Sequence, residues 1–159
     1  MFLSVSPLYG QDAGALTGAA GFEVSTISFR GAAGSLILYG AYNLSPRFAL
    51  GLRIGGGSDI KQMASIEGAA FFRWYFFTQG TPAPFHRRAF FVQAAAGGGI
   101  YSAFIDTGAP ASVHPVALGE GAAGLRLYFR HNNAPVFLEP FIRYAYPSGL
   151  GAGFVFGGG

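Results

Sequence analysis

The chain contains no cysteine, one lysine and few charged residues of either sign. Of its 159 residues, 11% are charged, whereas 51% are hydrophobic and 16% are aromatic. The lack of cysteine excludes disulfide frameworks and thiolate metal sites. The net charge of +3 at pH 7 comes without a cluster of Lys and Arg interleaved with aromatic residues, so we expect no nucleic-acid partner.

Long apolar runs are missing as well. No stretch approaches the roughly 20 apolar residues that a membrane-spanning helix needs, which excludes a helical membrane protein. The 26 glycines and 9 prolines stand in short clusters without a collagen repeat, and 17 Phe with 8 Tyr are too many for a disordered chain. The first four residues, Met1 to Ser4, lack the basic region of an export signal, so we expect the sequence of a mature protein.

The most informative feature that is present is a repeated pattern. The segment Glu67-Gly-Ala-Ala-Phe-Phe-Arg-Trp-Tyr-Phe76 recurs 53 positions later as Glu120-Gly-Ala-Ala-Gly-Leu-Arg-Leu-Tyr-Phe129. In both copies Glu, Arg and Tyr share one parity, and mostly Gly, Ala, Phe, Leu and Trp fill the other. Because side chains alternate between the two faces of a strand, one face is charged and the other is continuously apolar. The polar positions are few and balanced in sign, which is typical of the inside of a membrane β-barrel.

The chain divides into eight predicted strands. They cover about residues Phe2–Tyr9, Ser35–Asn43, Arg47–Gly56, Ser65–Phe77, Ala89–Phe104, Val116–Arg130, Val136–Tyr146 and Leu150–Gly157. The Gly/Ala/Ser/Thr-rich stretch 11–33 is predicted to be a long outer loop. An even number of strands allows a closure that leaves no unpaired edge in lipid. We therefore predict an all-β protein, an eight-stranded antiparallel up-and-down transmembrane β-barrel, with residues 1–159 forming a single domain.

The face assignment predicts a charged lumen. Three of the four Glu and four of the nine Arg fall on the inward parity, where they would have to pair with one another and block the barrel. The alternative is the solvated face of a soluble sheet, which is normally richer in Lys, and Arg suits a buried network better than Lys. The predicted charge network consists of Arg53, Glu67, Arg73, Glu120, Arg126, Glu139 and Arg143, and inward aromatic residues would plug one end.

The outward parity predicts an aromatic girdle beside the turns that follow the second, fourth and sixth strands. Such girdles lie at the membrane interface, and short turns usually face the periplasm. We therefore expect this end in the periplasm and the 11–33 loop outside. The girdle residues are Tyr42, Phe48, Trp74, Phe76, Phe90 and Phe129.

These patterns resemble a known family. The repeated Glu-Gly-Ala-Ala strand, the run from Phe90 through Gly99 and the closing segment Gly149–Phe156 are similar to the small eight-stranded outer-membrane barrels of the OmpA type. The resemblance implies a bacterial outer-membrane location, contact with outer-membrane lipid and lipopolysaccharide, and insertion by the barrel assembly machinery. We expect a monomer.

Candidate chemistry is sparse. The family that the chain resembles includes enzymes that modify lipid A, so Ser112 and His114, with Asp106 as an orienting carboxylate, form a candidate dyad in an outer loop. The three His are far apart in the sequence, so we expect no metal site and no cofactor.

The predicted function is that of a non-enzymatic outer-membrane barrel with a charge-plugged lumen, acting in envelope structure or in surface adhesion through its outer loops. Two alternatives remain open. One is a lipid A-modifying enzyme of the deacylase kind that uses Ser112 and His114. The other is a soluble lipocalin-like carrier, in which the Leu/Phe parity would line a pocket.

Overall fold

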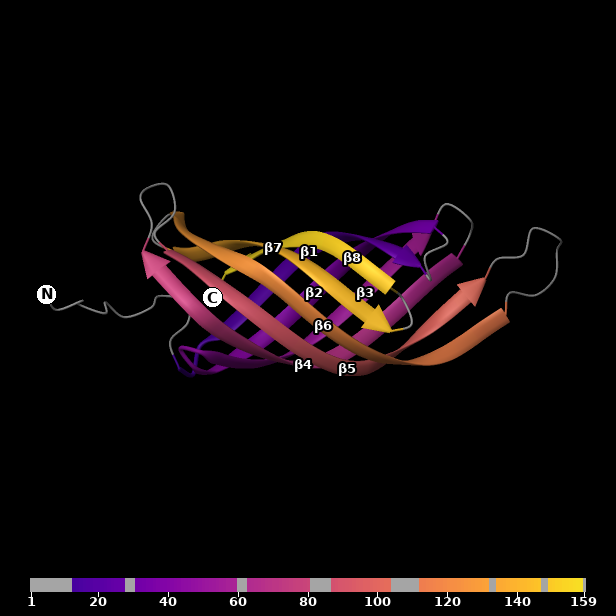
Figure 1. The fold of residues 1–159 in the computed structure, drawn as a ribbon, viewed down its shortest axis with the longest axis horizontal. Coiled ribbons are helices and arrows are strands. Elements are labelled where there is room, and N and C mark those ends of the chain that lie inside the picture. Colours follow the sequence, from indigo (N-terminus) through magenta and orange to yellow (C-terminus); the bar gives the residue numbers. More distant parts are fainter. Residues whose placement is uncertain are drawn as a thin grey trace, which may run out of the picture.

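The computed structural model describes residues 13–27, 31–59, 63–80, 87–103, 112–131, 134–146 and 149–158. Within these ranges each strand pairs antiparallel with the next, and β1 pairs with β8 to close the barrel (Figure 1). The predicted eight-stranded up-and-down barrel is confirmed. The strands are β1 (Leu16–Ile27), β2 (Gly31–Ser45), β3 (Phe48–Asp59), β4 (Met63–Gly80), β5 (Arg87–Ala103), β6 (Ser112–His131), β7 (Ala134–Tyr146) and β8 (Gly149–Gly158).

The first strand is not where the sequence predicted it. The predicted strand Phe2–Tyr9 lies outside the described residues, and the stretch 11–33, predicted to be an outer loop, contains β1. Gly and Ala are depleted in strands on average, which made this stretch resemble a loop. Its backbone is nevertheless paired on both sides, with β2 through Leu16–Ile27 and with β8 through Gly18–Ser25. Pairing on both sides therefore outweighs the weak local preference.

The two ends of the barrel differ in what they carry. The end that we call the terminal end holds the start of β1, the end of β8 and the tight turn between Ser45 and Phe48 (Figure 1). In that turn the Ser45 Oγ accepts hydrogen bonds from the backbone N–H groups of Arg47 and Phe48, both at 3.2 Å. The opposite, distal end holds the last residues of β1, β3, β5 and β7.

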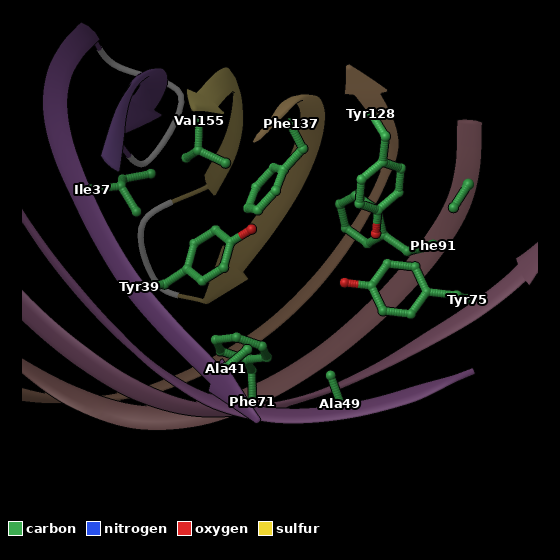
Figure 2. Close-up of a cluster of buried hydrophobic side chains, with 11 residues drawn as sticks. Ile37, Tyr39, Ala41, Ala49, Phe71, Tyr75, Phe91, Tyr128, Phe137 and Val155 are labelled. Atoms are coloured by element: carbon green, nitrogen blue, oxygen red, sulfur yellow. The ribbon is translucent and has the colours of Figure 1, made fainter. Parts of the chain in front are cut away.

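Aromatic side chains fill the lumen toward the terminal end. Tyr75, Phe91, Tyr128 and Phe137 are buried, and their rings turn toward one another from different strands in Figure 2. Tyr75 packs edge-on against Phe91 with ring centroids 6.1 Å apart, and Tyr128 packs in the same way against Phe137 at 6.2 Å. The lumen is therefore occupied by side chains at this end.

Three inward rings lie over glycines on a neighbouring strand. The cross-strand pairs are Gly51 with Phe71, Gly124 with Phe91, and Gly157 with Phe137. A Cβ at any of these glycines would collide with the partner ring and with backbone. Glycine lets the strand bend under an aromatic ring, a device that gives a sheet the curvature that closure needs.

Adding one methyl group at such a site should therefore be costly. We expect Gly124→Ala to destabilise the barrel by about 1–3 kcal/mol, because the Phe91 ring and the Pro140 carbonyl occupy the space of the new Cβ. Gly119 is on the same strand, and a Cβ added there would meet nothing within 4 Å. Gly119→Ala is therefore the matched control and should change stability by no more than about 0.5 kcal/mol. Urea unfolding in detergent micelles measures both variants. Equal stability of the two would show that the ring does not pack on the glycine.

Candidate functional site in the barrel lumen

The structure places the seven predicted network residues inside the barrel. All seven side chains are buried, and Gln93, on the same parity, is buried with them. They come from five strands, β3 to β7, and meet because alternate residues of every strand point into one lumen. Glycines on the same inward positions make room for the long side chains, since a Cβ at Gly55 would lie 3.1 Å from Arg53 Nη1.

One charged lumen residue was not predicted from the sequence. Glu23, on β1, is fully buried, and its Oε1 accepts hydrogen bonds from Arg143 Nη2 at 2.8 Å and Arg143 Nε at 3.1 Å. A signal was present, because Glu23 is flanked by the apolar residues Phe22 and Val24, as an inward charge on a lipid-facing strand would be. Glu23 was not assigned to the lumen because residues 11–33 were predicted to be a loop. With Glu23, the described side chains buried in the lumen include four Arg and four Glu.

The distal part of the network is a cluster of five charged residues. Arg53 donates to Glu67 at 2.8 Å and to Glu120 at 2.6 Å. Arg143 donates to the same two carboxylates at 3.1 and 2.9 Å, and also to Glu23. Three carboxylates therefore share two guanidinium groups, so this distal layer has a formal charge of −1.

Among the described residues, the terminal part of the network contains a single carboxylate. Glu139 Oε2 accepts from Arg73 Nη1 at 2.9 Å, from Arg126 Nε at 2.7 Å and from the Tyr39 hydroxyl at 3.2 Å. This terminal layer, with two Arg and one Glu, has a formal charge of +1. The opposite charges of the two layers cancel.

Aromatic rings contact the two guanidinium groups of the terminal layer, which has one carboxylate for two Arg. The Arg73 Cζ lies 4.2 Å from the ring centroid of Phe91, and the Arg126 Cζ lies 4.0 Å from that of Phe137. A guanidinium close to the face of a ring is attracted by the negative potential there. The same rings that fill the lumen therefore also stabilise its excess positive charge.

Gln93 joins the two layers. Its Oε1 accepts from Arg73 Nη2 at 2.7 Å and from Arg73 Nε at 3.0 Å, and its Nε2 donates to Glu120 Oε1 at 3.3 Å. A neutral amide offers an acceptor and a donor at once. It can therefore stand between a guanidinium and a carboxylate without adding charge.

The outer surface is apolar. The exposed large hydrophobic residues of the strands include Leu36, Leu52, Ile54, Ile66 and Phe154. Among the strand side chains that the structure describes, Arg88 is the one charged group on the outward parity, and it lies near the terminal end. The described residues therefore do not form the apolar pocket that a lipocalin-like carrier needs, because the Leu/Phe parity faces outward and the lumen is charged.

The predicted girdle residues lie on this outer surface around the terminal end. Phe48 stacks on Phe72 at 5.5 Å between ring centroids, and Phe76 lies between Trp74 at 5.6 Å and Phe90 at 6.3 Å. Of the six residues, five are exposed and Phe129 is half-buried. The exposed five are Tyr42, Phe48, Trp74, Phe76 and Phe90.

The candidate dyad is not in a loop as predicted. Ser112 and His114 are residues of β6 and pair with Ala103 and Tyr101 of β5. Extended backbone holds residues two apart at roughly 6.7 Å between Cα atoms, and a paired strand cannot bend as the predicted loop would have to. His114 is exposed, while Asp106 lies outside the described residues. Among the residues that the structure describes, no catalytic constellation is brought together here.

The described ranges offer no metal site. They contain no group of three His, Cys, Asp or Glu side chains that could hold a metal ion. No helix in the described part of the chain is long and apolar enough to cross a membrane.

The fold recurs in solved structures of bacterial outer-membrane proteins. The N-terminal β-barrel domain of Pseudomonas aeruginosa OprF is similar with a TM-score of 0.66 and 15% identity, over 90% of this chain and 96% of that chain. The chain has the fold of the small outer-membrane barrels. Neisserial surface protein A is similar with a TM-score of 0.61 and 14% identity, over 90% of this chain and 92% of that chain. No protein-family model and no curated protein matches the sequence.

Proposed function

We propose that the protein is a non-enzymatic integral barrel of a bacterial outer membrane, with a lumen closed by its own side chains. The observation that supports this proposal most strongly is that four Arg and four Glu are buried inside the barrel, whereas the outer surface is apolar. A sheet in water would hide its apolar face, whereas a barrel in lipid exposes it. We propose envelope structure or surface adhesion, through the distal end, as the role.

The charge pattern supports an orientation and a set of partners. An aromatic girdle marks a membrane interface, and Arg47 and Arg88 lie at the same end, where they suit anionic head groups. We propose that the terminal end faces the periplasm and that the distal end meets lipopolysaccharide. Insertion would proceed by the barrel assembly machinery, and the barrel would act as a monomer.

Exposed leucines provide the test of a lipid-facing surface. Leu52, in the middle of β3, and Leu44, beside the β2–β3 turn, are 67% and 49% exposed. In a bilayer, Leu52→Arg should cost about 2–4 kcal/mol and Leu44→Arg about 0–1 kcal/mol, measured by urea unfolding in lipid vesicles. If both cost no more than about 0.5 kcal/mol, as exposed sites in water do, the surface does not face lipid.

A closed lumen predicts little ion flow. An eight-stranded barrel is just wide enough to be filled by its side chains, and here aromatic residues and two ion-pair layers occupy it. Planar-bilayer recordings should show at most small and rare openings. A stable large conductance in the wild-type protein would contradict the closed lumen.

An assay of lipopolysaccharide deacylation tests the alternative that the protein is a lipid A-modifying enzyme. We expect purified wild-type protein to leave lipopolysaccharide acylated. If it deacylates lipopolysaccharide and His114→Ala abolishes the reaction, the lipid A-modifying function replaces the proposal.

A further inference from the structure

A small cavity lies between the two ion-pair layers. It has a volume of about 20 Å³, and its charged walls are Arg53 and Arg143 of the distal layer and Arg73 and Glu139 of the terminal layer. Gln93, which joins the layers, and Ala122 of β6 also line it. The cavity therefore sits at the junction where the two layers of opposite charge face each other.

Arg53, one of the residues that line the cavity, has a hydrogen-bond donor without an acceptor among the described residues. The two terminal nitrogens of Arg53 donate to Glu67 and Glu120, but its Nε is buried and has no hydrogen-bond partner among the described residues. A buried N–H that is left unpaired loses the free energy of its hydration without compensation. The cavity beside Arg53 has room for an acceptor that the described residues do not supply.

Size and charge decide which acceptor fits. A space of this volume holds one water molecule, which needs two to four polar partners, and the walls provide the Arg53 guanidinium, the Gln93 amide and the Glu139 carboxylate. An anion would add a net charge to the two ion-pair layers, in which the four described Arg already balance the four described Glu. A cation would lie against three guanidinium groups. Only a neutral ligand leaves the balance unchanged.

We propose that the cavity binds a single structural water molecule, which accepts a hydrogen bond from Arg53 Nε and links the two ion-pair layers. The water completes the network in the same way as the Gln93 amide, by offering an acceptor and a donor at once. This site is independent of where the barrel resides and of its role in the envelope.

Two small substitutions of Ala122 test the proposal. Ala122→Ser can place a hydroxyl where the water stands, whereas Ala122→Val fills the same space with methyl groups. With a water in the cavity, we expect the urea midpoint of Ala122→Ser to match the wild type and that of Ala122→Val to fall clearly below it. In a dry cavity the order is reversed, because Val fills the void and Ser adds an unpaired hydroxyl, and that order would overturn the proposal.

A second measurement does not depend on either variant folding. Wild-type crystals grown in bromide should show one water-sized density peak within hydrogen-bond distance of Arg53 Nε, without an anomalous signal. An anomalous peak would mean that the site takes an anion, and an empty cavity would mean that it is dry. Either result overturns the proposal.

Discussion

Glu139→Gln is expected to be the most damaging loss of a single lumen carboxylate, at about 3–5 kcal/mol of stability. Glu139 is the only carboxylate paired with Arg73 and Arg126 in the terminal layer as the described residues form it, so its loss leaves two buried guanidinium groups without a counter-charge. The distal carboxylates Glu67 and Glu120 each share their Arg partners, and their loss should cost less. Urea unfolding in lipid vesicles gives the comparison.

A double variant isolates the cause of this loss. Arg126→Met removes one of the two stranded charges and keeps most of the side-chain volume beside Phe137. If the charge is responsible, Glu139→Gln with Arg126→Met should cost clearly less than the sum of the two single variants. Arg47→Ala, at an exposed turn position, is the control and should change stability by about 0.5 kcal/mol or less. A Glu139→Gln protein as stable as the wild type would mean that the terminal layer does not hold the barrel together.

Arg143→Met is expected to give the second large loss, again about 3–5 kcal/mol. Arg143 makes both of the hydrogen bonds to Glu23 Oε1, and Glu23 Oε2 has no hydrogen-bond partner among the described residues, so Glu23 would be left as a buried unpaired carboxylate. The matched control is Arg53→Met in the same layer. Because Glu67 and Glu120 keep Arg143 when Arg53 is removed, Arg53→Met should cost less.

The outcome depends on Glu23, the charged lumen residue that the sequence analysis did not predict. Adding Glu23→Gln to Arg143→Met should restore part of the lost stability, because the stranded charge is removed. If Arg143→Met and Arg53→Met are equally stable, or if the added Glu23→Gln change lowers stability further, the assignment of Glu23 to Arg143 is wrong.

The sequence by itself determined the face of each residue in most strands. Period-two alternation is a local property, so the positions of Glu67, Arg73, Glu120 and Arg126 could be predicted from their own segments without knowledge of their neighbours. The same alternation separated the outward Leu and Phe residues from the charges. Eight segments were predicted, and their even number left an up-and-down barrel as the arrangement without a free edge in lipid, although the first segment was placed at Phe2–Tyr9 and not at β1.

The tertiary structure decided the position of β1 and the pairing of the lumen charges, which the local sequence pattern does not encode. β1 is rich in Gly and Ala and became a strand because β2 and β8 pair with it on both sides, which brought Glu23 into the lumen. Which Arg meets which Glu depends on register across several strands, as in the contact of Arg143 with Glu23, 120 positions apart. The division into a negative and a positive layer, and the rings that bend the strands over glycine, follow from the same register. Which inward side chains meet across the lumen depends on the circumference of the barrel, and all eight strands together set that circumference.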